Sequence, residues 1–135
     1  MLYFPENGTG PEEGVHALPG ADEPGLTLLE KNALAMEGKF AMNEYGNFGR
    51  KSKGARVIAT DNPIEDSISF YGQIGRGGVK GPLYDRPEGT RTIMPEGDVV
   101  THRVFTSTKD SPAVDIRVDA SVQVNAQKIH FIKGD

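Results

Sequence analysis

Apolar residues recur at helical spacing early in the chain, behind a motif that starts helices. In the run Thr27-Leu28-Leu29-Glu30, the Thr27 hydroxyl can accept from the Glu30 amide while the Glu30 carboxylate reaches back to the Thr27 amide. The apolar positions that follow are Leu29, Ala33, Met36 and Phe40. With Gly46 as a stop, the pattern predicts a packing helix from about Leu28 to Glu44.

A second helix is predicted to begin at Asn62-Pro63-Ile64-Glu65. This run places a capping side chain, a proline at the first helical position and an acid in the first turn. Gly75 is expected to end the helix. The residues expected to share its apolar face are Ile64, Ile68 and either Tyr71 or Ile74.

The period then changes from helical to two, which is typical of strands. Strands are predicted at Thr90–Met94, Val99–Phe105, Ala113–Asp119 and Gln127–Lys133, with a turn at Pro95-Glu96-Gly97-Asp98. The sequence therefore predicts an α+β fold: an N-terminal helical segment, then one helix packed on an antiparallel sheet of four or five strands.

Two glycine-rich stretches complete the chain. Residues 1–26 combine Gly, Pro and acids without periodicity and indicate an extended leader or linker. Residues 46–57 form a glycine-rich basic segment in which Arg50, Lys51 and Lys53 lie close together. We interpret it as a solvated hinge, with phosphate contact as the alternative.

Composition narrows the class of protein. The chain has 135 residues, 36% hydrophobic and 25% charged, with no Cys, so disulfides, thiolate metal sites and cysteine nucleophiles are excluded. The formal net charge is −4; residues 1–54 hold 8 acids and 5 bases, and residues 55–135 hold 11 acids and 10 bases. Neither part has the basic excess of a protein that grips phosphates by bulk charge, so a nuclease would need a local cationic cluster.

Strand alternation sorts candidate residues onto one face of the predicted sheet. Val114, Ile116 and Val118 point one way, with Asp115 and Arg117 on the other side, and Ile129 and Phe131 likewise leave Lys128 and His130 on that other side. In Val99–Phe105 the alternation does not decide between His102 and Arg103. The loop before the next strand adds Thr106, Ser107 and Lys109.

These residue types match the chemistry of RNA phosphodiester cleavage. A base takes the proton of the 2′-hydroxyl, an acid protonates the leaving 5′-oxygen, and imidazole suits both tasks near neutral pH. Arg and Lys stabilise the phosphate charge, and Asp115 can orient an imidazole or guanidinium. Tyr71, Lys80 and Arg117 are further candidates for substrate contact, and no metal or cofactor is expected.

Each candidate also has a structural interpretation. Asp115 could pair only with Arg117 or Lys128 across strands, and the Ser/Thr loop could be turn chemistry alone. Arg76-Gly77-Gly78-Val79-Lys80 could cradle a phosphate, although a plain turn is the commoner explanation. His16 lies in the leader and has no assigned role.

The motifs of residues 62–135 resemble a known family. They are Phe70-Tyr71-Gly72, Met94-Pro95-Glu96-Gly97, Arg103 with Thr106-Ser107-Thr108, Ser111-Pro112-Ala113-Val114-Asp115-Ile116 and Gln127-Lys128-Ile129-His130-Phe131. Together they look like the C-terminal toxin tips of bacterial polymorphic and contact-dependent growth inhibition proteins.

The resemblance implies a barnase/EndoU/colicin/RelE-type ribonuclease, many of which cut transfer RNA. It implies a cleft built from Arg103, the Thr106/Ser107 loop, Asp115 and His130. An aromatic residue often stands at the position of His102 in this family, which argues against a catalytic role for that histidine. The implied partners are RNA, a cognate immunity protein and a host factor such as elongation factor Tu, without stable membrane association.

On this interpretation residues 1–57 are a linker and helical delivery segment of a larger secreted or cell-surface protein, and residues 58–135 are the toxin domain, acting in the target-cell cytoplasm. The leading hypothesis is a metal-independent ribonuclease toxin. The alternatives are a non-enzymatic β-rich phage structural or decoration protein, and a deoxyribonuclease, for which Asp110, Asp115 and Asp119 are too loosely arranged to form a metal centre.

Overall fold

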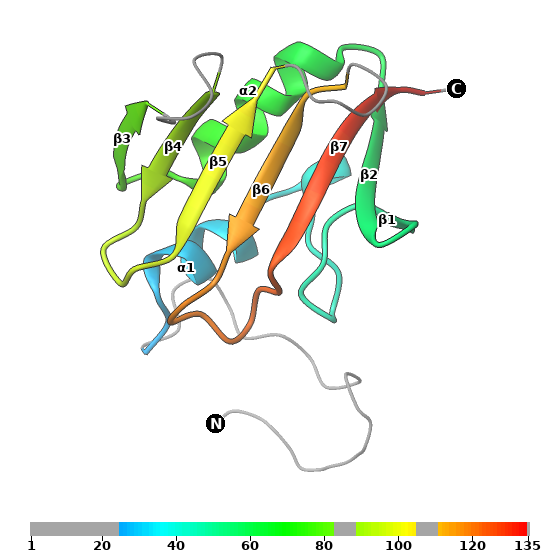
Figure 1. The fold of residues 1–135 in the computed structure, drawn as a ribbon. Helices are drawn as coiled ribbons and strands as arrows, with labels where there is room; N and C mark the ends of the chain where they lie inside the picture. Colours follow the sequence, from blue (N-terminus) through cyan, green and yellow to red (C-terminus); the bar gives the residue numbers. More distant parts are fainter. Residues whose placement is uncertain (1–24, 83–88, 105–110, 135) are drawn as a thin grey trace, which may run out of the picture.

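The fold is a twisted sheet with all its helices on one side (Figure 1). The computed structural model describes residues 25–82, 89–104 and 111–134. The helices are α1 (Leu28–Leu34), the 3-10 helix η1 (Gly38–Phe40) and α2 (Pro63–Ile74). The strands are β1 (Arg50–Ser52), β2 (Ala55–Thr60), β3 (Val79–Pro82), β4 (Gly89–Ile93), β5 (Val99–Arg103), β6 (Ala113–Arg117) and β7 (Gln127–Lys133).

The seven strands form one mixed sheet in the order β1-β2-β7-β6-β5-β4-β3. Every neighbouring pair is antiparallel except β2 and β7, which run parallel. The predicted α+β class is confirmed, and so are the four predicted strands, although β5 and β6 end earlier than expected. The prediction of one helix on a four- or five-stranded antiparallel sheet is wrong, because β1, β2 and β3 extend the sheet at both edges.

The basic segment interpreted as a hinge is a β-hairpin. β1 and β2 pair through Arg50↔Val57 and Ser52↔Ala55. The two residues between them, Lys53 and Gly54, have φ values of 50° and 81°. Positive φ at both central residues is the signature of a type I′ turn, whose twist matches that of the flanking strands.

Helix α1 begins as predicted and ends early. Both hydrogen bonds of the capping box are present, from the Glu30 amide to Thr27 and from the Thr27 amide to Glu30. The helix stops at Leu34 rather than Glu44, because the backbone is extended at Glu37 and Gly38 takes a φ of 65°. Met36 and Phe40 are nevertheless buried.

Helix α2 has the predicted bounds but a different buried face. Ser67, Phe70, Tyr71 and Ile74 are buried, whereas Ile64 and Ile68 are about half exposed. The burial follows the i, i+3, i+4, i+7 series that starts at Ser67, so the expected face through Ile64 and Ile68 is wrong.

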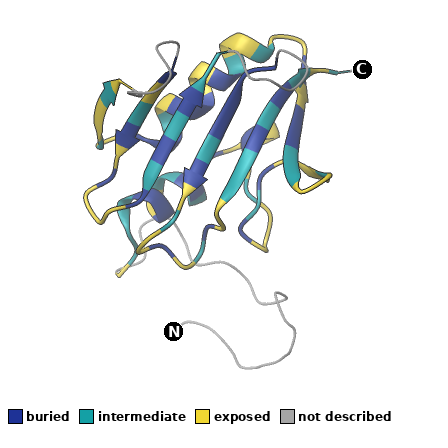
Figure 2. Cartoon of the chain, in the orientation of Figure 1, coloured by how far each residue is buried: buried dark blue, intermediate teal, exposed yellow. Residues whose placement is uncertain are grey.

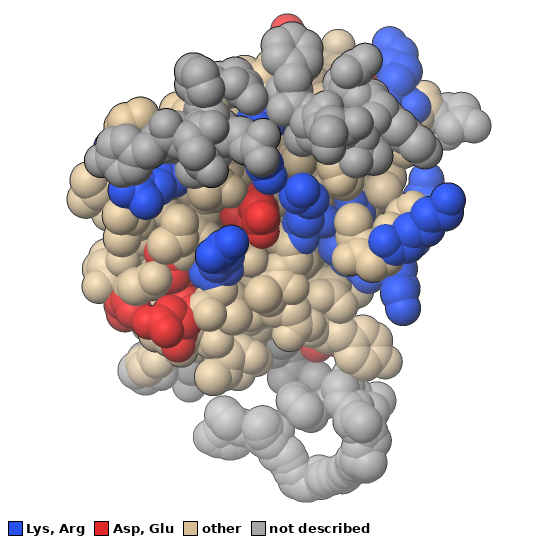
Figure 3. Space-filling view, in the orientation of Figure 1, with Lys and Arg blue, Asp and Glu red and all other residues tan. Residues whose placement is uncertain are grey.

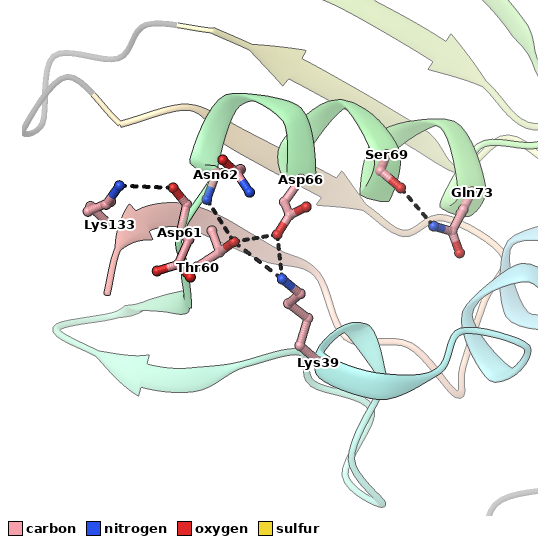
Figure 4. A network of polar contacts seen from close by, with 8 residues as sticks. All are labelled: Lys39, Thr60, Asp61, Asn62, Asp66, Ser69, Gln73 and Lys133. Atoms are coloured by element: carbon pink, nitrogen blue, oxygen red, sulfur yellow. Dashed lines mark hydrogen bonds and ion pairs between the residues drawn. The ribbon is translucent and has the colours of Figure 1, made fainter. Parts of the chain in front are cut away.

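The start of α2 is held by a polar cluster rather than by its expected cap (Figure 4). The Asn62 side chain makes no capping hydrogen bond. The backbone N–H of Asn62 donates to the Thr60 hydroxyl at 3.1 Å. Asp66 accepts from Thr60 and from the Lys39 ammonium, the latter at 2.7 Å. The hydrogen bonds from Lys39 and then Thr60 lower the pKa of Asp66. The cluster ties η1, β2 and α2 together.

The core lies between α2 and the sheet and is centred on Phe70. Its ring packs edge-on against Phe48, Phe40 and Phe131, with centroid distances of 4.9, 5.5 and 5.5 Å. Leu29 and Ala33 of α1 belong to the same core cluster. Residues on both sides of position 57, the expected domain boundary, therefore share one sheet and one core.

Candidate functional site

The sheet face turned away from α2 carries the candidate residues. Val114, Ile116, Ile129 and Phe131 are fully buried toward the helix, while the alternate positions of β6 and β7 are mostly half-buried or exposed (Figure 2). We call the opposite side the open face. The strand register places on it Asp115 and Arg117 of β6 and Lys128 and His130 of β7, as the sequence predicted.

The open face is cationic. Five of its strand residues are Lys or Arg, and Asp115 is its one carboxylate among the described strands: Arg50, Arg91, Arg103, Arg117 and Lys128 are the cations. Figure 3 shows basic side chains around an acidic area near the middle of this face, and a second acidic area at its lower left. The net charge of −4 for the whole chain therefore does not describe this face, because its described strands carry five cations and one carboxylate.

His130 and Arg103 lie in the same cross-strand row. Arg103 pairs with Ala113, and Ala113 pairs with His130, so two strand spacings of ~4.8 Å separate the two backbones. Both side chains leave the sheet on the open face, and Ala113, which is 2% exposed, lies between them in the row.

Ser111 holds the His130 ring. The Ser111 hydroxyl lies 2.9 Å from Nδ1 of His130, and Ser111 is buried. A hydrogen bond at Nδ1 fixes the orientation of the ring. Sequence reasoning expected Asp115 to orient the imidazole and did not select Ser111 for that task.

Asp115 lies next to this row. It pairs with Thr101 of β5 and Lys128 of β7, and His130 is its diagonal neighbour. Among the residues that the structure describes, no Lys or Arg nitrogen forms an ion pair with Asp115 within 4.0 Å. The interpretation of Asp115 as one half of a cross-strand ion pair is therefore not supported.

His102 lies on the opposite side of the sheet, against α2. It is 6% exposed, and its ring stacks on Tyr71 with centroids 5.3 Å apart. Its Nε2 lies 2.9 Å from the Ser67 hydroxyl, which itself donates to the Ile64 carbonyl at 2.8 Å. Ser67 therefore accepts from His102, whose ring is neutral with its proton on Nε2. Burial lowers the pKa of His102, which favours this neutral form.

Two predicted substrate contacts also lie on the helix side. Tyr71 is 5% exposed, and its hydroxyl accepts from Thr92 at 2.7 Å. The Lys80 ammonium sits over the Tyr71 ring, 5.6 Å from its centroid. His102, Tyr71 and Lys80 thus form one stack behind the sheet, and we remove all three from the candidate site.

The remaining predicted residues, Thr106, Ser107 and Lys109, lie outside the described residues. Sequence reasoning missed Arg50 and Arg91 on the open face. Arg91 lies inside the predicted strand Thr90–Met94, but it stands between two threonines, so alternation alone does not assign its face. The place of Arg50 depends on the parallel pairing of β2 with β7, which the sequence did not predict.

Within the described segments, no three His, Cys, Asp or Glu residues are grouped as a metal ion would require. No helix among those residues is long and apolar enough to cross a membrane. No family model, curated protein or solved structure matches the chain.

Proposed function

We propose that this chain is a metal-independent endoribonuclease whose active site lies on the open face. The observation that carries the proposal is the row Arg103–Ala113–His130, in which an imidazole and a guanidinium lie on the same face of the sheet two strand spacings apart. Lys128 and Asp115 stand in the adjacent row. The arrangement joins a proton-transfer group with cations on a solvent-facing surface, as the reaction requires.

The roles follow from the contacts. His130, held by Ser111 at Nδ1, transfers a proton as general base or general acid. Arg103 and Lys128 hold the phosphate and stabilise the charge that develops when the 2′-oxygen attacks phosphorus. Asp115 lies diagonal to His130 and opposite Lys128 on the same face.

RNA is the proposed substrate because the nucleophile is its own 2′-hydroxyl. The 2′-oxygen forms a bond to phosphorus as its proton passes to the base, and the bond to the 5′-oxygen breaks as that oxygen receives a proton. The products are a 2′,3′-cyclic phosphate and a free 5′-hydroxyl. Proton transfer and charge stabilisation are all that this step requires of the protein.

The biological setting that we propose is that of the toxin family whose motifs the chain resembles. RNA is cut in the cytoplasm of a competing bacterium, with transfer RNA as the first substrate to examine. A cognate immunity protein neutralises the activity, and a host factor such as elongation factor Tu presents the substrate. The cationic open face is the surface that an acidic inhibitor would cover.

The test is incubation of the purified full chain with total RNA in EDTA, with and without cell extract. Wild type should cut RNA, whereas His130→Ala and Arg103→Ala should each lose about two or more orders of magnitude of activity. His16→Ala, a histidine of the leader, is the matched control and should retain activity. RNA left intact by the wild type in both conditions would remove the proposal and favour the structural-protein alternative.

A further inference from the structure

The β1–β2 hairpin carries a cationic group that the proposed chemistry does not use. Arg50 and Lys53 are exposed, and neither makes an ion pair with a residue that the structure describes. Lys51 pairs with Arg56 and leaves the hairpin on the helix side of the sheet. We call Arg50 and Lys53 the hairpin cations. Figure 3 shows basic surface at the edge of the molecule where Figure 1 places the hairpin.

The hairpin is anchored, so its cations have a defined place. The neighbouring Arg56 donates from Nε to the Phe48 carbonyl and from Nη2 to the Gly49 carbonyl, both at 2.8 Å. Its guanidinium is therefore used to hold the base of the hairpin. The type I′ geometry at Lys53 and Gly54 fixes the tip.

The hairpin extends the catalytic row. Arg50 pairs with Val57, and Val57 pairs with His130 in the parallel ladder. The row therefore runs Arg103–Ala113–His130–Val57–Arg50, with one arginine two strands away on each side of the imidazole. At ~4.8 Å per strand, Arg103 and Arg50 lie about 19 Å apart along the sheet.

The imidazole and the hairpin arginine lie two strand spacings apart, about 10 Å. At the ~3.4 Å per phosphate of one strand in a duplex, 10 Å corresponds to about three phosphates, and an extended strand would place fewer there. A phosphate bound at His130 and a phosphate at the hairpin would therefore belong to different nucleotides of one chain.

We propose that the hairpin cations form a subsite for phosphates about one to three nucleotides away from the bond that is cut. The substrate is then a polynucleotide laid across the strands from β5 toward β1, and its length contributes to affinity. This inference rests on the proposed ribonuclease function and names the part of the substrate that the second site holds.

A simpler reading of the same residues is edge protection. Charged side chains on an edge strand discourage pairing with other chains, and β1 is an edge strand. This reading predicts that neutralising the hairpin cations promotes aggregation. It predicts no effect on the affinity of a monomeric protein for RNA, so the two readings separate experimentally.

The test variant is Arg50→Gln/Lys53→Asn in the full chain. Asparagine at position 53 removes the charge and suits the positive φ of the turn, so the hairpin should fold as before. The matched control is Arg76→Gln/Lys133→Gln. It removes the same charge from two exposed residues on the helix side of the molecule.

The first measurement is kcat and KM on a 30-nucleotide single-stranded RNA at several salt concentrations. Losing two phosphate contacts should weaken affinity about fivefold to thirtyfold at 0.1 M salt and lower the slope of log affinity against log salt by about 1.4. The weaker affinity should appear as a higher KM with kcat unchanged, whereas Arg103→Ala lowers kcat. An unchanged KM, or an equal rise in the control, would overturn the subsite.

The second measurement does not depend on cleavage. Fluorescence anisotropy compares binding of 2′-O-methyl oligonucleotides of 30 and 2 nucleotides, which lack a free 2′-hydroxyl. The hairpin variant should bind the long oligonucleotide more weakly and the short one as wild type does. If both proteins bind the long oligonucleotide equally, the subsite is refuted even when RNA is cut. If RNA is not cut but the expected difference in binding is found, only the ribonuclease mechanism is refuted.

Discussion

Replacing His102 separates a structural histidine from the histidine proposed to be catalytic. His102→Ala deletes a buried ring that stacks on Tyr71 and donates to Ser67. Ser67 keeps its hydrogen bond to the Ile64 carbonyl, so it is not left unsatisfied. Lost packing, the stacked pair and one hydrogen bond together should lower the free energy of unfolding by about 2–4 kcal/mol.

His102→Phe is the sharper variant. It keeps an aromatic ring against Tyr71 and removes only the hydrogen bond to Ser67 and the titratable imidazole. The free energy of unfolding at pH 7.5 should therefore fall by about 1 kcal/mol. The difference in free energy of unfolding between the wild type and His102→Phe should become smaller in acid. Burial lowers the pKa of His102 in the folded state, so below the unfolded pKa of about 6.5 the unfolded chain binds a proton that the folded chain does not.

The free energy of unfolding of the wild type is therefore highest above about pH 6.5. It falls as the pH drops toward the lowered pKa of His102, by at most ~1.4 kcal/mol per pH unit. The assay is urea unfolding of wild type and His102→Phe at pH 7.5 and 5.5, with RNA cleavage measured on the same samples. The difference in stability should shrink at pH 5.5, and cleavage should persist. Abolished cleavage with unchanged stability would place His102 in the active site and refute the reasoning.

Two further predictions concern the framework. Phe70→Ala removes the ring that contacts Phe48 and Phe131 edge-on and should cost about 4–5 kcal/mol in urea unfolding; a loss below about 2 kcal/mol would contradict the central place of this ring. Burial raises the pKa of Asp98, but hydrogen bonds from the Asp119 amide, the Ser121 hydroxyl and the Ala120 and Ser121 amides outweigh it, so the pKa is lowered. The carboxylate should therefore stabilise the fold above pH ~4 and lose that contribution as the pH falls through its folded pKa. Asp98→Asn should cost about 1–3 kcal/mol at pH 7 and progressively less in acid; a cost independent of pH would show that the charge is not what matters.

The sequence predicted elements whose signals are local. The capping box at Thr27, the Pro63 start of the second helix and its end at Gly75 depend on neighbours in the chain, and the structure confirms them. The alternation in β6 and β7 placed Asp115, Lys128 and His130 correctly on one face, because Val114, Ile116, Ile129 and Phe131 leave no other choice.

The failures share a long-range cause. In β5 both faces mix polar and apolar residues, so only the pairing of His102 with Val114 shows that the imidazole faces the helix. In α2 the buried Ser67 makes the true face look less apolar than the one through Ile64 and Ile68. The β1–β2 hairpin reads as a loop because its turn places a lysine at positive φ and its partner strand, β7, comes some 70 residues later.

The central claim is tested most directly by an RNA oligonucleotide cut by the wild type, compared with the same oligonucleotide carrying a single 2′-deoxy nucleotide at the cleaved bond. Mass spectrometry of the fragments in EDTA should find a 2′,3′-cyclic phosphate and a 5′-hydroxyl, and the substituted bond should stay intact. Cleavage of the deoxy bond, or fragments ending in a 3′-hydroxyl and a 5′-phosphate, would contradict attack by the 2′-oxygen under the control of His130.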